Sequence, residues 1–254
     1  MISFRNSRWH IDAPLVIAHR GASLQAPENT LRAFSLAEDL GADAIEMDAK
    51  LTADRRVVIH HDLTLERTTN GKGRVSSLRL DEIKRLDAGI KFDRSCSGER
   101  IPTLDEVIEL VGHRLLFNIE LTNYASPFDN LPEIVVDIVR KYKMQTRVLV
   151  SSFNPIALIR VRKIEPDMMC GLLIKSSEPR WVRELFKRLV KYEAIHPSYD
   201  LIDETFIRQS VDSGKLVNAW TINNREKIVE LLGLGIDGII TDDPGRVRDI
   251  VLAR

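Results

Sequence analysis

Short apolar runs alternate with longer amphipathic segments along almost the whole chain. Leu15–His19 is the first run, and Ala42–Asp48 is the second; between them, apolar residues in Glu28–Leu40 recur every three or four positions. A short apolar run is typical of a buried strand, whereas the three-to-four spacing is typical of a helix with one buried face. Gly41 follows the helical segment, where a glycine commonly ends a helix. This part of the chain therefore predicts a strand, a helix and a second strand.

The same alternation resumes after Pro102. We predict further strands at Leu115–Leu121, Arg147–Ser152, Met168–Ile174, Ala194–His196, Lys215–Trp220 and Ile236–Thr241. We predict further helices at Leu104–Val111, Pro132–Lys143, Pro155–Ile164, Pro179–Val190, Asp203–Ser213, Asn224–Leu232 and Pro244–Leu252. With Arg56–His60 as an extra extended piece of the second unit, eight strand–helix units in 254 residues predict a closed α/β barrel, the (β/α)8 TIM barrel. An open doubly wound sheet is less favoured, because no Gly-x-Gly-x-x-Gly loop is present.

One segment departs from this alternation. Between Leu63 and Arg100 the apolar runs are few, charges are frequent, and Asn70-Gly71 is a strong turn signal. Only Ser77–Leu86 has a helical pattern there. We predict a single domain over residues 1–254, in which about residues 63–101 form a small insertion after the second strand.

Charge and composition exclude several classes of protein. Basic and acidic residues balance at 37 each, so a sequence-wide basic footprint for nucleic acid is absent. No apolar run is long enough for a transmembrane segment, and Met1–Asp12 has no apolar signal core. Cys96 and Cys170 match no zinc spacing and suit free thiols in a reducing compartment. We expect a cytoplasmic protein that binds a small molecule.

Acidic residues stand at the predicted ends of two strands. Glu46 and Asp48 are two positions apart, so on a strand both side chains point to one face, and Glu120 ends the next barrel strand. Strand ends of a parallel barrel face the same mouth, so the three carboxylates can meet. Such a cluster favours a hard divalent cation, Ca²⁺ or Mg²⁺. The alternative is that these acids form ion pairs with Arg or Lys.

Two histidines and an arginine flank these acids. His19 and His61 can divide the roles of general base and general acid, because histidine titrates near neutral pH. Arg20 offers a fork of donors to a phosphate. His60 competes with His61, since only one of two adjacent strand residues can point into the site. A cation, an arginine and two histidines at one mouth indicate phosphoryl transfer or phosphodiester cleavage.

Other strand-end residues are less informative. Trp220 is either core packing or an aromatic wall for the apolar part of a substrate. Ser151 and Ser152 lack the Gly-x-Ser-x-Gly context of a nucleophile. The remaining polar residues at predicted strand ends are His196, Asn223 and Asp242.

Several motifs follow one another in order over nearly the whole length. They are His19–Gly21, Pro27–Thr30, Glu46-x-Asp48, His61-Asp62, Leu65–Gly71, Ile101–Leu104, Asn118–Glu120, Ser151–Phe153, Trp220–Asn223 and Asp237–Pro244. Each motif alone is weak, but their order and spacing together are highly specific. On these residues the chain resembles the glycerophosphodiester phosphodiesterases.

The resemblance implies metal-dependent hydrolysis of glycerophosphodiesters to an alcohol and glycerol 3-phosphate on a βα barrel with a small insertion. It implies that His19 and His61 are the acid/base pair, and the Leu-x-Arg-Thr-Thr register selects His61 over His60. It further implies Arg20 as a phosphate ligand, a metal held by Glu46, Asp48 and Glu120, and Glu28 near the site.

There is one departure from the family pattern. Members usually have a lysine two residues after the third-strand glutamate, where this chain has Thr122; Lys175 is a candidate replacement charge. The missing lysine leaves open a catalytically weak binding protein. A third hypothesis is an enzyme that cleaves a larger lipid diester, such as a lysophospholipid, with Phe92, Phe128 and Trp181 as an apolar surface.

Overall fold

The computed structural model describes residues 8–9 and 14–253. The prediction that Met1–Asp12 lacks a signal core therefore lies largely outside the described residues. Within the described ranges, no helix is long and apolar enough to cross a membrane.

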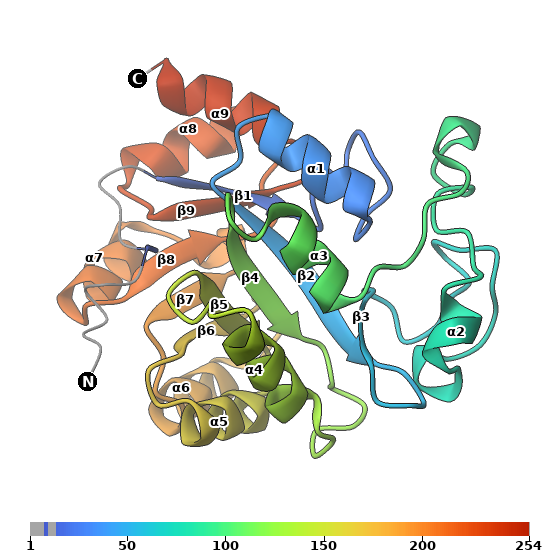
Figure 1. Cartoon of the computed structure of the whole chain (residues 1–254). Helices are drawn as coiled ribbons and strands as arrows, with labels where there is room; N and C mark the ends of the chain where they lie inside the picture. Colours follow the sequence, from blue (N-terminus) through green and yellow to red (C-terminus); the bar gives the residue numbers. More distant parts are fainter. Residues whose placement is uncertain (1–7, 10–13, 254) are drawn as a thin grey trace.

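Eight parallel strands close into a barrel, which confirms the predicted TIM-barrel fold (Figure 1). The strands run in the order β1-β9-β8-β7-β6-β5-β4-β2, and β1 pairs with β2 to close the ring. Their bounds are β1 Leu15–His19, β2 Ala44–Leu51, β4 Leu116–Leu121, β5 Val148–Ser152, β6 Met169–Ile174, β7 Ala194–Pro197, β8 Leu216–Ala219 and β9 Gly238–Thr241. The carboxyl ends of all eight strands therefore face one mouth.

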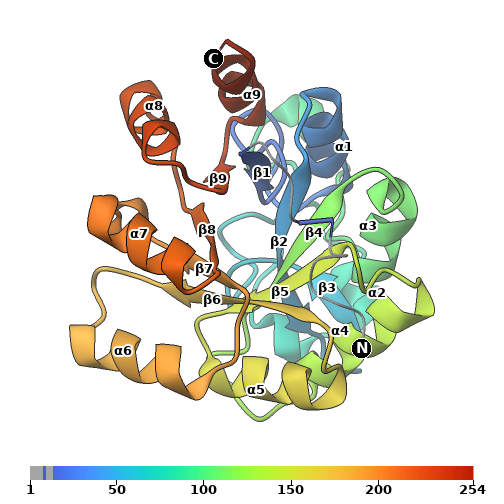
Figure 2. The ribbon, with the colours of Figure 1, turned by 90° about the vertical axis from the view of Figure 1, so that its left-hand side faces the viewer.

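Helices surround the strands as an outer ring, which is clearest in the turned view (Figure 2). Their bounds are α1 Leu31–Asp39, α3 Leu104–Val111, α4 Leu131–Lys141, α5 Pro155–Ile164, α6 Arg180–Leu189, α7 Glu204–Asp212, α8 Arg225–Gly233 and α9 Pro244–Leu252. Every predicted barrel helix forms, with bounds that shift by at most three residues at one end.

Local capping residues set where these helices begin. Thr103 accepts a hydrogen bond from the backbone N–H of Glu106, whose carboxylate accepts one from the N–H of Thr103; this reciprocal pair starts α3. Asn154 caps α5, which opens with Pro155. The sequence predicts the first helix from Glu28, but the helix begins at Leu31, because Thr30 is its N-cap. Capping by a short polar side chain thus decides the first residue of each of these helices.

The core has an inner and an outer layer, as the alternation of side chains along each strand requires. Leu15 and Ile17 of β1 pack inside the barrel, and Val16 and Ala18 pack outward against the helices. His19 continues the inward series at the mouth. The same alternation that fills the barrel therefore aims the polar end of β1 into the site.

β2 is longer than predicted and extends past the barrel. Its last residues pair antiparallel with β3, Val57–Ile59, in the register Ala49 to Ile59. This antiparallel strand is the extra extended piece predicted at Arg56–His60. The extension carries the chain from β2 back to the mouth, where His60 and His61 follow.

The segment between β3 and α3 lies beside the barrel (Figure 1). It contains only short helical turns, η2 Val75–Ser77, α2 Leu80–Ile83 and η3 Arg94–Cys96. A small apolar cluster holds it together; its buried members are Val58, Leu65, Val75, Ile83, Ala88 and Ile101. The helix predicted over Ser77–Leu86 is shorter than expected, because its two ends are in turns. The division into one domain with an insertion over about residues 63–101 stays a prediction.

Candidate active site

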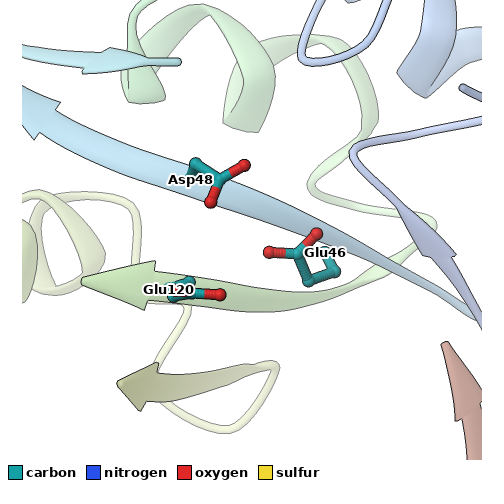
Figure 3. A group of neighbouring side chains, drawn as sticks. All are labelled: Glu46, Asp48 and Glu120. Carbon is teal, nitrogen blue, oxygen red and sulfur yellow. The ribbon is translucent and has the colours of Figure 1, made fainter. Parts of the chain in front are cut away.

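Three carboxylates meet at the mouth of the barrel (Figure 3). Glu46 and Asp48 project from β2, and Glu120 projects from β4, in direct register with Asp48. One oxygen from each residue lies within 4.8 Å of the others. Alternation on β2 and parallel pairing with β4 thus bring together residues that are more than seventy positions apart.

Burial makes this cluster electrostatically unfavourable without a cation. Burial, Asp48 and Glu120 raise the pKa of Glu46 well above its usual range. Burial and then Asp48 raise the pKa of Glu120 to about 7, although the Tyr124 hydroxyl donates a hydrogen bond to it. Three converging carboxylates offer only oxygen ligands, which Ca²⁺ and Mg²⁺ prefer. The donor set therefore fits a hard divalent cation.

Arg20 lies against the cluster in a left-handed backbone conformation, with φ of 59°. Its backbone N–H donates to Glu46 Oε2 at 3.1 Å, and its Nη1 donates to Glu28 Oε1 at 2.9 Å. Its Nε lies 3.2 Å from Asp48 Oδ2, which also accepts from Asn29 Nδ2 at 2.8 Å. Although burial lowers the pKa of Arg20, these three carboxylates raise it above the usual value. The guanidinium is thus a fixed positive charge beside the cluster.

His19 is held by a carboxylate from the last barrel unit. Its Nδ1 lies 2.7 Å from Asp242 Oδ1, and a carboxylate can only accept, so Nδ1 carries the proton. Ser23 and Asn223 also donate to Asp242, at 2.9 and 2.6 Å. Burial would raise the pKa of Asp242, but the bond to His19 helps lower it to about 2. The other nitrogen, Nε2, lies 4.0 Å from Glu46 Oε2 and is free for proton transfer.

His61, which also lies at the mouth, is held in the same way. Its Nδ1 lies 2.6 Å from Asp62 Oδ1, which leaves Nε2 available. Arg67 donates to both oxygens of Asp62 and to both oxygens of Glu28. Burial alone would raise the pKa of Glu28, but hydrogen bonds from Arg67 and Arg20 help lower it to about 2. Asp62, Arg67 and Glu28 thus form a continuous chain of charged groups from His61 to Arg20.

His60 points away from this mouth. Its ring is buried, and Nε2 lies 3.0 Å from the backbone carbonyl of Thr64. The side chain of His61, in contrast, is 42% exposed. Of these two adjacent histidines, only His61 is thus open at the mouth; its role as the second catalytic histidine stays a prediction.

A cavity opens beside the carboxylates. Trp220 and Phe153 form one wall, with their rings edge to face and 5.5 Å between centroids. Trp220 Nε1 donates to the carbonyl of His196 at 2.8 Å, which fixes the indole. The lining residues are His19, Arg20, Glu46, His61, Asn118, Glu120, Phe153, Leu173, Trp220 and Ile240. Both histidines, the arginine and an aromatic wall thus face one space.

Residues 19–246 match the model of the glycerophosphoryl diester phosphodiesterase family, which is most of the chain. The chain belongs to this family. The family is one of phosphoric diester hydrolases, and the matched range contains the three carboxylates, both histidines and Arg20.

Relatives and solved structures of the family align with this chain over nearly their whole length. A glycerophosphodiester phosphodiesterase of Caldanaerobacter subterraneus subsp. tengcongensis is 42% identical over 240 residues, 93% of this chain and 97% of the relative. A phosphodiesterase structure from Oleispira antarctica, in complex with the product sn-glycerol-3-phosphate, has a TM-score of 0.87 and 32% identity, with coverage of 95% and 98%. The glycerophosphodiester phosphodiesterase structure from Thermotoga maritima has a TM-score of 0.77 and 27% identity, with coverage of 96% and 100%.

Not every predicted strand-end residue of this family member reaches the cavity. His196 is buried inside the barrel beside Asn218, and burial lowers its pKa to about 3. Ser152 donates to the backbone carbonyl of Leu121, and Ser151 is buried. The ammonium of Lys175 lies 5.5 Å from the centre of the Phe153 ring, at the edge of the aromatic wall.

The sequence predicts no role for three residues that contact the site. Asn29 binds Asp48, Arg67 links Asp62 to Glu28, and Tyr124 binds Glu120. Asn29 and Arg67 lie inside family motifs, which is the one signal that could have pointed to them. Tyr124 lies in the loop after β4 and has no such signal. Asp242 stands at a predicted strand end, but its bond to His19 follows only from barrel closure.

Proposed function

We propose that this chain hydrolyses glycerophosphodiesters to an alcohol and glycerol 3-phosphate, with His19 and His61 as the acid/base pair. The observation that carries the proposal is the convergence of two carboxylate-held histidines, Arg20 and a carboxylate cluster on one cavity. Membership of the family supports the reaction class, and the product named for the Oleispira antarctica structure supports the product. We also propose, from the sequence, that it acts in the cytoplasm.

The cluster would hold one divalent cation, Ca²⁺ or Mg²⁺, through Glu46, Asp48 and Glu120. Its raised carboxyl pKa values support this role, because negative charge brought together in a buried place needs a positive partner. A cation bound there would supply charge neutralisation at the phosphate oxygens.

The histidines divide the proton transfers between them. Each has its Nδ1 hydrogen directed to an aspartate, so each presents Nε2 to the reaction. One Nε2 takes the proton of the nucleophile, and the other donates a proton to the departing alcohol oxygen. The nucleophile is water or the neighbouring glycerol hydroxyl; the latter route passes through a cyclic phosphate.

Arg20 and Trp220 bind the two chemically different parts of the substrate. The guanidinium of Arg20, held by Glu28 and next to Asp48, donates to non-bridging phosphate oxygens. The face formed by Trp220 and Phe153 contacts the carbon skeleton. Charge and apolar surface therefore orient the diester across the two histidines.

Turnover assays with glycerophosphocholine and glycerophosphoethanolamine test the proposal. We expect release of glycerol 3-phosphate, loss of activity with EDTA, and recovery with Ca²⁺ or Mg²⁺. Glu120→Gln should abolish both the activity and its dependence on the cation. Its matched control is Glu226→Gln, which removes an exposed carboxylate from the first turn of α8 and should leave both unchanged. Full activity in EDTA would contradict the carboxylate metal site, and absence of turnover on every diester would contradict the function.

Exposed aromatic residues favour one alternative substrate, a lysophospholipid. Phe92, Phe128 and Trp181 are 45%, 74% and 69% exposed, so they are not packed in the core. Comparing acylated with deacylated substrates separates the two enzyme hypotheses, because only a lipid substrate gains from apolar surface outside the cavity. The remaining hypothesis, a catalytically weak binding protein, rests on Thr122 alone. Efficient turnover of any diester would exclude it.

A further inference from the structure

α6, Arg180–Leu189, lies in the outer ring between α5 and α7, but the barrel buries none of its residues (Figure 2). Each of the other seven helices of the ring has at least two buried side chains. Within α6, Phe186 alone packs against the main core, and it is only half-buried. α6 therefore presents surface that the barrel does not use.

An apolar stripe runs along the outer side of α6. Trp181, Leu185 and Leu189 follow one another at intervals of four residues, so their side chains form one row about 12 Å long. These side chains are 69%, 43% and 55% exposed. Val182 and Phe186 are half-buried and lie beside the row, on the side toward the barrel. The apolar face of α6 is thus wider than the surface that the barrel covers, and its outer half is uncovered.

Basic residues border this apolar stripe. Residues 175–191 contain six basic and two acidic side chains, whereas the whole chain has 37 of each kind. One of the two acids, Glu184, is already paired with Lys187 at 3.0 Å. Arg180 and Arg188 are exposed, and within residues 8–9 and 14–253 neither forms an ion pair with a carboxylate. Two guanidinium groups without acidic partners therefore flank the row of apolar side chains.

Charge decides between the surfaces that could cover the apolar stripe. Antiparallel two-fold pairing of α6 with a second copy of this chain would place Arg180 against the Arg188 of that copy. Parallel pairing would place each of these arginines against its own equivalent, so like charges meet in both arrangements. An anionic lipid bilayer, in contrast, offers an apolar layer for leucine, a headgroup layer for tryptophan and phosphates for arginine. The arrangement on α6 is complementary to that surface.

We propose that α6 docks this protein on an anionic phospholipid surface. The apolar stripe enters the interface, and Arg180 and Arg188 contact lipid phosphates. The helix lies on the bilayer and does not span it, since it has only 10 residues. A five-residue loop joins the end of β6 to the start of α6, so Trp181 lies at the mouth end of the ring. Docking therefore holds the mouth of the barrel near the lipid surface, whichever diester the site cleaves.

Co-sedimentation of the full chain with lipid vesicles tests this inference. The vesicles contain phosphatidylcholine alone or phosphatidylcholine and phosphatidylglycerol in equal parts. Wild-type protein should bind the mixed vesicles, and added salt should weaken this binding. The partition coefficient should be lower by about tenfold or more on phosphatidylcholine alone, because the neutral surface does not attract the arginines.

Two pairs of variants assign the binding to α6. Trp181→Ser should lower the partition coefficient on mixed vesicles by about tenfold or more, and Leu189→Ser should lower it several-fold. The matched control is Leu252→Ser, which removes an exposed leucine from the end of α9. Arg180→Gln combined with Arg188→Gln should lower the coefficient about 10- to 30-fold. Its control, Arg225→Gln, removes an exposed arginine from the start of α8, and both controls should bind like wild type.

Three results would overturn the inference. The first is absence of wild-type binding to the mixed vesicles. The second is a loss of binding in the controls as large as the loss in the α6 variants, since α6 would then have no special part. The third is a dimer in analytical ultracentrifugation that Trp181→Ser dissociates, because a second copy would then cover the apolar stripe. Melting temperatures show whether each variant folds, and if Trp181→Ser does not, the variant with both arginines replaced decides.

Discussion

Asp242 Oδ1 lies 2.7 Å from Nδ1 of His19, and 223 positions of sequence separate the two residues. The contact exists because β9 pairs with β1, so the end of the last strand lies beside the end of the first. Both oxygens of Asp242 are occupied by donors, from His19 and Ser23 on one side and from Asn223 on the other. Barrel closure thus fixes the orientation of one proposed catalytic histidine.

We predict that Asp242→Asn lowers kcat about 100-fold or more while KM changes little. An amide has one accepting oxygen, so its NH₂ group must face either His19 and Ser23 or the NH₂ of Asn223. Either orientation disturbs the tautomer or the position of the imidazole. Steady-state kinetics measures the effect. Ser23→Ala, which removes one donor to the same carboxylate, serves as the milder control and should cost less than about fivefold.

Substitution of His61 should lower kcat, whereas substitution of its neighbour His60 should lower mainly thermal stability. His61→Gln should lower kcat about 100- to 10,000-fold, because it removes a proton-transfer group whose Nε2 faces the cavity. His60→Gln should leave kcat within a few-fold and affect mainly thermal stability, since its ring is buried against Thr64. Kinetics together with melting temperatures of both variants checks this. A larger kinetic loss in His60→Gln would reverse the assignment.

Without a cation, the protein should lose stability as the pH rises from about 4.5 to 7. Burial, then Asp48, raise the pKa of Glu120 to about 7 from its usual 4.5, so the folded state binds more protons than the unfolded state in this range. The free energy of unfolding should fall by up to about 3 kcal/mol across it. Urea unfolding in EDTA at pH 5 to 8 measures the slope.

Two comparisons make this pH dependence specific to the cluster. Glu120→Gln should flatten the slope, and saturating Ca²⁺ or Mg²⁺ should remove most of it, since a bound cation stabilises the charged carboxylates. Glu28 and Asp242, whose pKa values are lowered to about 2, act in the opposite direction and only at lower pH, where protonating them destabilises the fold. An unchanged slope in Glu120→Gln would argue that other groups cause it.

Gly21→Ala should destabilise the fold by about 2 kcal/mol or more. Gly21 has φ of +84°, and a Cβ there would lie 2.6 Å from the backbone carbon of Ala33. Gly73 is a matched control, because its φ is +91° but nothing lies within 4 Å of the position that a Cβ would take there. Gly73→Ala should cost only the backbone strain, about 1 kcal/mol. Equal melting temperatures for the two variants would show that the contact with Ala33 is not limiting.

Elements defined by local signals could be predicted from the sequence. The helices at Leu104–Val111, Pro155–Ile164 and Pro244–Leu252 form over the predicted residues, because an N-cap and a continuous apolar face define each one. The segment Ser77–Leu86 shows the limit of this reasoning. Its helical pattern is short, and the turns that pack Val75 and Ile83 into the small apolar cluster restrict the helix to Leu80–Ile83.

The sequence by itself determined the eight strand–helix units, the family and the inward pair Glu46 and Asp48, because periodicity and motif order are properties of neighbouring residues. Only the tertiary structure decided which distant groups complete them. Pairing of β2 with β4 brings Glu120 to Asp48 and Thr122 to Lys50, and pairing of β9 with β1 brings Asp242 to His19. Hydrogen-bond register between strands fixes these contacts, and register depends on the closure of the whole barrel.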